Sequence, residues 1–203
     1  MRAAFAEARA ALAEGEVPVG CVLVPVDASC AANAQLAADD DDDENKSKGS
    51  SNSNNSKKND AVERLIAARG RNATNREHHA LAHAEFVAVE ALLRELAANG
   101  QQRPASLAGY VLYVVVEPCI MCAAMLLYNR VQKVFFGCGN PRFGGNGTVL
   151  AVHTAAGCSA PGYESSGGHR ADEAVALLQE FYRHENTNAP GHKRRRKCEC
   201  LNN

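Results

Sequence analysis

The sequence predicts an α/β fold in which helices pack around a mostly central sheet. Two continuous apolar runs, VPVGCVLV at residues 17–24 and YVLYVVV at residues 110–116, have the pattern of strands that are covered on both faces. Other segments carry apolar residues at helical spacing. Because such strands and helices alternate along the chain, we expect a layered α/β domain.

Length and composition favour one globular domain. The chain has 203 residues, of which 46% are hydrophobic, so it is long enough to bury a full core, and two domains are not expected. The net charge is −1, but residues 39–60 hold seven acids and four lysines and so carry −3, which leaves +2 for the remaining chain. The acidity is therefore local.

The sequence indicates an intracellular protein that resides in the cytoplasm, the nucleus or both. Residues 1–14 are Ala-rich with scattered charges and do not resemble a signal peptide. No run of 18 or more apolar residues predicts a membrane span. In a reducing compartment, the eight cysteines point to metal or redox chemistry before they point to structural disulfides.

The first elements are a helix and a hairpin. The Ala-rich segment at residues 2–15 ends in a glycine, which is typical of a short helix with a glycine stop. We expect strands near residues 19–26 and 62–69 to form a hairpin whose tip holds an insertion at about 38–60. From Asp39 to Asp60 this insertion has no apolar side chain, so it is expected to be disordered. Because the cost of closing a loop grows only logarithmically with its length, the fold tolerates it.

Helices and strands alternate through the rest of the chain. We expect, in order, a helix over residues 83–98, a strand over 110–116, a short helix over 119–129, a strand over 133–139 and a glycine-rich loop over 141–149. Apolar residues at helical spacing predict a buried stripe on the first of these helices: Phe86, Val89, Leu93 and Leu96. A last amphipathic helix near residues 172–185 is expected to face five residues inward: Ala174, Leu177, Leu178, Phe181 and Tyr182.

Residue types that bind metals occur in two short segments. In PCIMC, Cys119 and Cys122 are three residues apart at the start of the short helix, and this spacing puts both sulfurs on one face. Unpaired backbone amides at a helix start favour the thiolate form. With His83, the cysteines make three ligands and leave a fourth position vacant, which is the arrangement of a catalytic zinc. The alternative interpretation of Cys-x-x-Cys in an intracellular protein is a redox pair.

Glu85 lies two residues after His83, and this spacing limits how both can serve one ion. Positions two apart on an ideal helix diverge by about 200°, so the two side chains share a site only where the helix begins. The carboxylate would then shuttle protons beside the water that the metal activates. The alternative is that His83 caps or decorates the helix and that Glu85 lies favourably near its positive end.

The spacing H-x-E followed by P-C-x-x-C is the signature of the zinc nucleobase deaminases, in which the glutamate is an acid and base rather than a ligand. The segments HAE, PCIMC, GCGNPRFGGNGTV and LLQEFYRHENTNAP resemble the catalytic subunit of the eukaryotic tRNA adenosine deaminases. Members of that family convert the wobble adenosine of the anticodon to inosine. The resemblance runs from VPVGCV to the basic tail and leaves out mainly the polar insertion.

This resemblance implies a cytidine-deaminase-like fold with a central mixed five-stranded sheet in a three-layer α/β/α arrangement. Residues 1–192 would form the deaminase domain, interrupted at about 38–60, and residues 193–203 a basic tail. The implied cofactor is Zn²⁺ and the implied catalytic residue is Glu85. The resemblance also implies a heterodimer with a catalytically inactive deaminase-like subunit that lacks this glutamate, so the present chain resembles the active member.

The same resemblance implies a set of substrate contacts. Asn72 in GRNATN would contact the target nucleotide, and three residues would lie near the base: Val19, Gly20 and Ala84. The alternative for Asn72 is a turn asparagine, because asparagine suits turns regardless of function. The chain differs from many members of the family in having Asn146 where a cysteine is common.

Two further features suit an RNA substrate. An anticodon loop already presents unpaired bases, and Arg142 and Phe143 lie in the loop expected beside the pocket, where they suit phosphate contact and base stacking. Phe143 could instead pack the loop. A basic run adds salt-dependent attraction to phosphates: Lys193, Arg194, Arg195, Arg196 and Lys197. Its alternatives are a solvated end or a nuclear import signal.

Two other functions compete with a tRNA deaminase. A free cytidine, deoxycytidylate or guanine deaminase would share the zinc motif, but the basic tail and the extended loop disfavour it. An inactive RNA-binding partner with a structural zinc is disfavoured by the intact Glu85.

Overall fold

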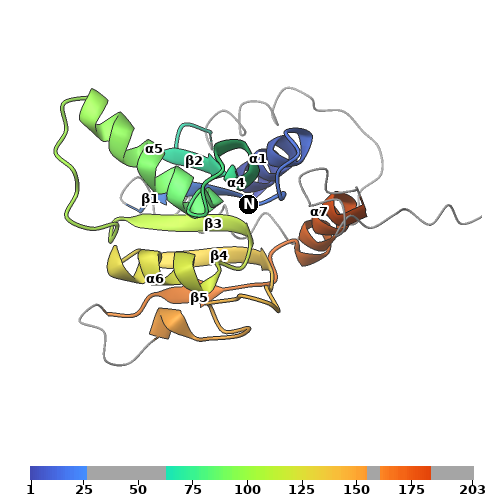
Figure 1. Ribbon diagram of the computed structural model, residues 1–203. Coiled ribbons are helices and arrows are strands. Elements are labelled where there is room, and N and C mark those ends of the chain that lie inside the picture. The colour runs from blue at the N-terminus through green and yellow to red at the C-terminus, as the bar shows by residue number, and fades with distance from the viewer. Residues whose placement is uncertain (27–62, 155–160, 184–203) are drawn as a thin grey trace, which may run out of the picture.

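One mixed five-stranded sheet forms the centre of the molecule (Figure 1). The computed structural model describes residues 1–26, 63–154 and 161–183. The strands are β1 (Gly20–Pro25), β2 (Ala68–Arg71), β3 (Tyr110–Val116), β4 (Lys133–Cys138) and β5 (Glu164–Ser166). They lie in the order β2-β1-β3-β4-β5, where β1 is antiparallel to β2 and β3, and β3, β4 and β5 are parallel. The expected five-stranded mixed sheet is confirmed.

Helices cover both faces of this sheet, as Figure 1 shows. They are α1 (Arg2–Ala13), α4 (Thr74–Glu77), α5 (Ala84–Ala98), α6 (Ile120–Tyr128) and α7 (Ala171–Arg183), with a 3-10 turn at Val152–Thr154. Helices α1 and α7 pack on one face, and α5 and α6 on the other. The three-layer α/β/α arrangement is confirmed. None of the helices in the described ranges has the length and apolarity to span a membrane.

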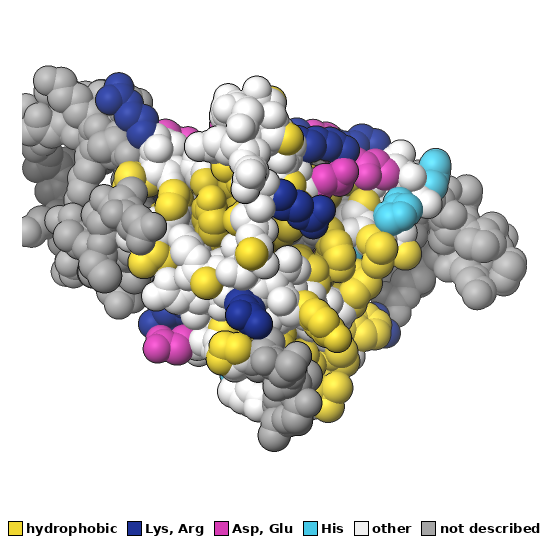
Figure 2. All heavy atoms as spheres, turned by 90° about the vertical axis from the view of Figure 1, so that its left-hand side faces the viewer, with side chains coloured by type: hydrophobic (Ala, Val, Ile, Leu, Met, Phe, Trp, Pro, Cys, Tyr) yellow, Lys and Arg dark blue, Asp and Glu magenta, His cyan; other side chains and the backbone are white. Residues whose placement is uncertain are grey.

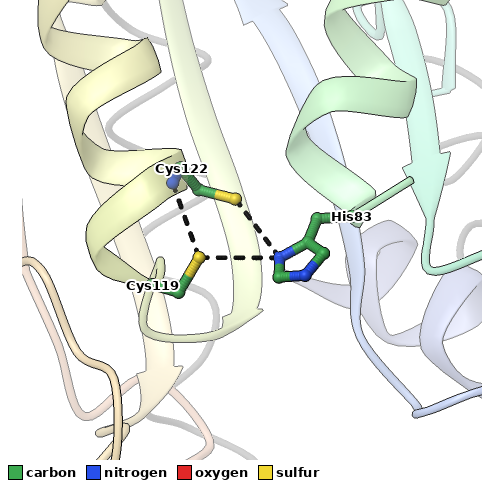
Figure 3. A group of neighbouring side chains, drawn as sticks. All are labelled: His83, Cys119 and Cys122. Atoms are coloured by element: carbon green, nitrogen blue, oxygen red, sulfur yellow. Dashed lines mark hydrogen bonds between the residues drawn. The ribbon is translucent and has the colours of Figure 1, made fainter. Parts of the chain in front are cut away.

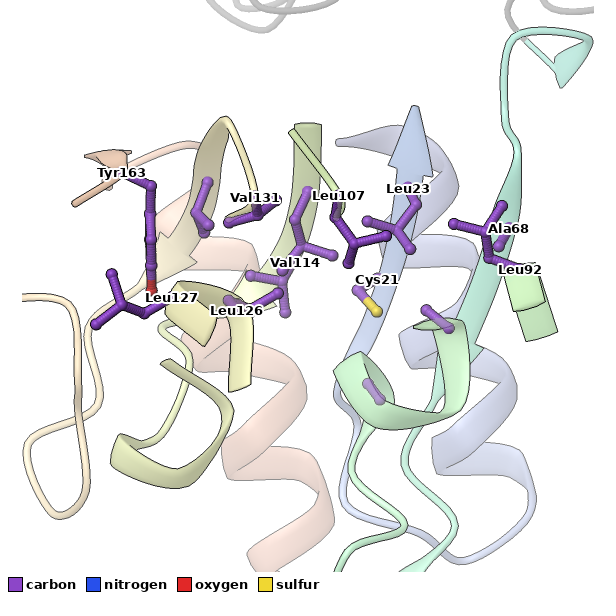
Figure 4. Packing of buried hydrophobic residues seen from close by; sticks show 14 residues of the cluster. Cys21, Leu23, Ala68, Leu92, Leu107, Val114, Leu126, Leu127, Val131 and Tyr163 are labelled. Carbon is purple, nitrogen blue, oxygen red and sulfur yellow. The ribbon is translucent and has the colours of Figure 1, made fainter. Parts of the chain in front are cut away.

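Strand β3 is the centre of the core. Leu112 and Val114 point into the cluster under α5 and α6, which Figure 4 shows from close by, whereas Tyr113 and Val115 point into the cluster under α1 and α7. Because successive side chains of a strand alternate between faces and both faces are covered here, every position needs an apolar residue. This accounts for the unbroken apolar run in the sequence.

Strands β1 and β2 form the expected hairpin, but β2 begins later than predicted. Leu23 pairs with Ala68 and Gly20 with Arg71, so among the described residues β2 spans 68–71, whereas the predicted strand began near residue 62 and ended at 69. The chain just before β2 makes a turn instead, in which the Ile66 N–H donates to the Glu63 carbonyl at 3.3 Å. The polar insertion expected at about 38–60 lies outside the described residues.

Helix α5 occupies the predicted range, but the predicted buried stripe is only partly correct, since Val89 and Leu96 pack against the core cluster and Phe86 and Leu93 do not belong to it. Its apolar members, Phe86, Val89, Leu93 and Leu96, are only half-buried, and the buried residues are Ala84, Glu85, Ala88 and Leu92. The reason is the close approach of α5 to β2 at Gly70. A Cβ added at Gly70 would collide with the backbone of Ala84 and Ala88, so small residues occupy the contact line and larger ones lie to its sides.

Helix α7 also lies close to the predicted residue range, but one of the five side chains expected to face inward does not. Ala174 and Leu177 are buried, and Leu178 and Phe181 are half-buried, but Tyr182 is 68% exposed. The last turn of α7 borders the pocket described below rather than the core, so Tyr182 faces that opening. Strand β5 had no individual prediction, since the sequence ESS carries no apolar pattern.

Gly20 is where α1 packs most tightly on β1. A Cβ at this position would collide with the backbone nitrogen of Ala8 and the backbone oxygen of Ala4. We expect Gly20→Ala to lower the free energy of unfolding by about 1–3 kcal/mol, as overpacking does, because backbone atoms cannot rotate aside. Urea denaturation measures this. Gly109→Ala is the control, since nothing lies within 4 Å of its added Cβ, and equal stability of the two variants would contradict the prediction.

Candidate active site

Two helix starts hold the candidate metal ligands (Figure 3). His83 and Cys119 are the N-cap residues of α5 and α6, and both have extended backbone angles, φ −74° and ψ 153° for His83 and φ −66° and ψ 165° for Cys119. Cys122 lies in the first turn of α6, and its N–H donates to the Cys119 Sγ at 3.5 Å. Because α5 and α6 cover the same face of the sheet, their N-termini bring the three side chains together.

The geometry of this cluster fits a tetrahedral ion. His83 Nδ1 lies 3.5 Å from the Sγ of Cys119 and 3.5 Å from the Sγ of Cys122, and the three donor atoms all lie within 4.8 Å of one another. Zinc bonds of about 2.0–2.3 Å at tetrahedral angles put two donor atoms roughly 3.5 Å apart. One imidazole and two sulfurs are also ligands that zinc prefers. The residues present therefore fit a zinc ion.

Electrostatics favour a cation at the same place. Hydrogen bonds from Cys122 and His83 lower the pKa of Cys119 to about 4, whereas the contact with Cys119 and then burial raise the pKa of Cys122. The hydrogen bond to Cys119 raises the pKa of His83. The two thiols thus differ in acidity. A divalent cation offsets both negative charges, so that both sulfurs bind as thiolates and a proton is released.

Glu85 lies beside this cluster, as the helix-entry geometry requires. It is the second residue of α5, it is only 3% exposed, and it lines the same pocket as His83. Burial, followed by the negative charge of Cys119, raises the pKa of Glu85 to about 7. A carboxyl group with such a pKa both accepts and releases a proton near neutral pH. The expectation that His83 and Glu85 meet only at the start of the helix is confirmed.

A pocket of about 410 Å³ opens above these residues, a volume typical of small-molecule sites. Of the six residues expected at the pocket itself, five line it: Asn72, Val19, Ala84, Arg142 and Phe143. Gly20 does not belong to its described wall, because it packs against α1 instead. The five basic residues Lys193, Arg194, Arg195, Arg196 and Lys197 lie outside the described residues.

Glu117 organises the loop that carries Arg142 and Phe143, a role that the sequence did not reveal. It is 2% exposed and accepts hydrogen bonds from three backbone N–H groups: Asn140 at 2.8 Å, Asn146 at 2.9 Å and Thr148 at 3.1 Å. Although burial opposes ionisation, the side chain of Thr148 and then these backbone N–H groups hold the pKa of Glu117 below its ordinary value. The sequence offers one signal for this role: Glu117 is an acidic residue directly after the apolar strand β3 and directly before Pro118 and Cys119.

Asn146 supports the same loop from its other side. Its Oδ1 accepts a hydrogen bond from the Tyr163 hydroxyl at 2.9 Å, and its Nδ2 donates to Ser165 Oγ at 2.7 Å. Both amide atoms are thus occupied by residues of the segment around β5. Asn146 therefore bridges two parts of the fold.

Known proteins match this chain in sequence and in structure. A family model, the cytidine and deoxycytidylate deaminase zinc-binding region, matches residues 60–138, which include His83, Glu85 and both cysteines. The tRNA-specific adenosine deaminase 2 of Xenopus tropicalis is 35% identical over 201 residues, which is 97% of this chain and 95% of that protein. The tRNA-specific adenosine deaminase subunit tad2 of Schizosaccharomyces pombe is 40% identical over 125 residues, 62% of this chain and 31% of that protein.

A solved structure agrees with these sequence matches. It comes from work on A-to-I editing by tRNA:A34 deaminases at the wobble position of transfer RNA. It is 25% identical with a TM-score of 0.60, and the match covers 88% of this chain and 97% of that one. The present chain matches the Xenopus tropicalis tRNA deaminase over almost its full length and carries the deaminase zinc-binding region. The chain therefore belongs to the tRNA-specific adenosine deaminase family of zinc-dependent enzymes.

Proposed function

We propose that this protein converts the wobble adenosine of tRNA anticodons to inosine by zinc-dependent hydrolysis. One observation carries the proposal. In a chain of the tRNA adenosine deaminase family, the buried carboxylate of Glu85 lines the same pocket as the His83, Cys119 and Cys122 cluster. The other residues of this pocket leave space for a nucleotide.

The roles of the residues follow from their positions. His83, Cys119 and Cys122 hold the zinc ion, which supplies Lewis-acid chemistry that makes water nucleophilic near neutral pH. Glu85 takes a proton from the attacking water as the new C–O bond forms at the ring carbon that bears the amine. It then passes that same proton to the amine, so that the C–N bond breaks, ammonia leaves and the ring carbon keeps the oxygen of the water. The raised pKa of Glu85 suits both transfers.

Residues of the pocket wall hold the nucleotide and its neighbours. Asn72, Val19 and Ala84 contact the target nucleotide, Arg142 binds a phosphate, and Phe143 stacks on a base. Exposure supports the stacking role, because the Phe143 side chain is 61% exposed at the pocket and so does not pack the loop. Its backbone is held in place, since the Ile120 N–H donates to the Phe143 carbonyl at 2.8 Å.

Removal of the Phe143 ring tests the stacking role. We expect Phe143→Ala to lower kcat/KM for tRNA roughly 10- to 100-fold, mainly through KM, because base stacking on an aromatic ring contributes binding free energy of this size. Val149→Ala is the matched control, since Val149 is 44% exposed on the same loop but outside the pocket wall. Steady-state kinetics on one tRNA compare them, and equal KM values would exclude Phe143 from the RNA contact.

We infer that the active enzyme is a heterodimer with a catalytically inactive deaminase-like subunit. The Schizosaccharomyces pombe relative is named a subunit. Figure 2 shows hydrophobic side chains gathered along one edge of the molecule, on the side that α5 and α6 cover in Figure 1. On these helices Tyr128 is 82% exposed, and Phe86, Leu93 and Met121 are half-buried. Apolar surface of this kind supports association with another protein.

One experiment tests both the reaction and the partner. The purified chain is incubated alone and with its deaminase-like partner, each time with a tRNA that carries a wobble adenosine, and inosine is measured. We expect inosine only in the mixed sample. Deamination of free nucleosides without tRNA would overturn the proposed substrate, and full activity of the chain alone would overturn the heterodimer.

A further inference from the structure

Glu16 is a buried carboxylate that the chemistry described so far does not use. It lies between α1 and β1 and is 1% exposed. Its Oε2 accepts hydrogen bonds from Asn72 Nδ2 at 2.9 Å and from the Asn75 N–H at 3.2 Å, and its Oε1 accepts one from the Arg76 N–H at 2.6 Å. Burying a carboxylate is costly unless hydrogen bonds compensate it. All three compensating donors belong to the segment that carries Asn72.

The contact with Glu16 fixes which way the Asn72 amide points. The Glu16 Oε2 accepts the hydrogen bond from Asn72 Nδ2, so the NH₂ group of Asn72 faces Glu16. The same Nδ2 donates to Thr74 Oγ1 at 3.0 Å. The donor side of Asn72 is thus committed. Within the described residues, Oδ1 is the side-chain atom of Asn72 that has no partner, and Asn72 lines the pocket.

Glu16 also holds the backbone that follows Asn72. Helix α4 begins after Ala73, whose side chain has no atom that could accept a hydrogen bond from the first turn. Glu16 supplies that acceptor from a distant part of the chain, since it takes the N–H groups of Asn75 and Arg76. Glu16 thus holds both the side chain of Asn72 and the start of α4, whereas the Asn72 N–H donates to the Val19 carbonyl at 2.9 Å.

We propose that Glu16 is a positioning residue for the deamination, because it presents the Oδ1 of Asn72 to a hydrogen-bond donor of the bound nucleotide. The inference rests on the proposed function. Glu16 does not line the pocket itself and acts only through Asn72. Without an acceptor oxygen at this position, the Asn72 amide is free to turn and to offer its NH₂ group where the nucleotide needs an acceptor.

A double-mutant cycle tests this coupling. Glutamine has the size of glutamate but both donates and accepts, so we expect Glu16→Gln to lower kcat/KM on wobble-adenosine tRNA roughly 10- to 100-fold, as a misplaced substrate contact does. Bound zinc should be unchanged. In the Asn72→Ala background, the same substitution should change kcat/KM less than about threefold, because residues that act as one unit are not additive.

Glu14→Gln is the matched control. Glu14 lies two residues earlier and pairs with the side chains of Arg71 and Arg76 at 2.8 and 2.6 Å, but it does not touch Asn72. We expect its kcat/KM to stay within about twofold of the unsubstituted protein, as for a partly exposed ion pair. Thermal unfolding and zinc content are measured for every variant, which separates misplacement of Asn72 from loss of the fold.

Each outcome decides between the interpretations. An unchanged kcat/KM in Glu16→Gln, or losses that multiply fully with Asn72→Ala, would overturn the positioning role. If Glu16→Gln does not fold, Glu16→Asp takes its place in the cycle, since it keeps a carboxylate for the backbone donors but is one methylene shorter. Absence of inosine with the unsubstituted protein and its partner would instead overturn the proposed function. Failure of the proposed function is therefore distinguishable from failure of the Glu16 inference, which is measured only in the variants.

Discussion

Glu85→Gln is expected to lower turnover by roughly a hundred- to ten-thousand-fold and to leave zinc bound. Glutamine fills the same buried space but cannot take a proton from water or return one to the leaving amine. The metal ligands are the side chains of other residues, so the cluster of His83, Cys119 and Cys122 remains intact. The effect is therefore expected in kcat, with little change in the affinity for tRNA.

Single-turnover kinetics on tRNA, together with elemental analysis of the purified variant, measure these two properties separately. Glu90→Gln is the control, because Glu90 lies on the same helix but pairs with Arg94 at 2.6 Å on its exposed side. Near-normal turnover in Glu85→Gln would remove Glu85 from the mechanism. Loss of zinc from this variant would make Glu85 a ligand rather than an acid and base.

Cys122→Ser is expected to abolish both zinc retention and inosine formation. The hydroxyl of serine does not ionise near neutral pH as a thiol does, and it is a poorer zinc ligand than thiolate. Because the ion ties the start of α5 to the start of α6, its loss should also lower the midpoint of thermal unfolding, as expected for any ligand that binds only the folded state.

A cysteine outside the cluster provides the comparison for this variant. Cys138 in β4 is a free thiol that is not part of the metal cluster, so Cys138→Ala should retain zinc. Treatment of the unsubstituted protein with a chelator should reproduce the defect of Cys122→Ser, and added zinc should reverse it. Inosine formation by metal-free protein would contradict the zinc mechanism.

The parts of the fold and site that the sequence predicted are those set by local patterns. Strand β3 is apolar at every position because both of its faces are covered. His83 and Glu85 are two residues apart, and Cys119 and Cys122 three apart, at the starts of helices where such spacings bring side chains together. Each of these features depends on a few neighbouring residues, so a single sequence reveals it.

The features that escaped prediction depend on contacts between distant segments. Ala84 and Ala88 of α5 lie against Gly70 of β2, which brings the helix close to the sheet, and nothing within the helix sequence records this. Glu16 and Glu117 are buried because distant backbone amides surround them. A glutamate whose partners lie 20 to 60 residues away has the same local pattern as a surface glutamate.

The hydrogen bonds of Glu117 have a consequence for protein engineering. The residue stands directly before Pro118 and Cys119, and its carboxylate binds the backbone at both ends of the loop that carries Phe143. The backbone of the loop is therefore anchored beside the metal centre, and the Asn146 side chain ties the same loop to the segment around β5. The exposed side chains of this loop should tolerate exchange, but Asn146 and the tightly packed Gly144 and Gly145 should not, and insertions or deletions would displace the catalytic machinery. Libraries aimed at new RNA substrates should keep its length constant and diversify its exposed positions.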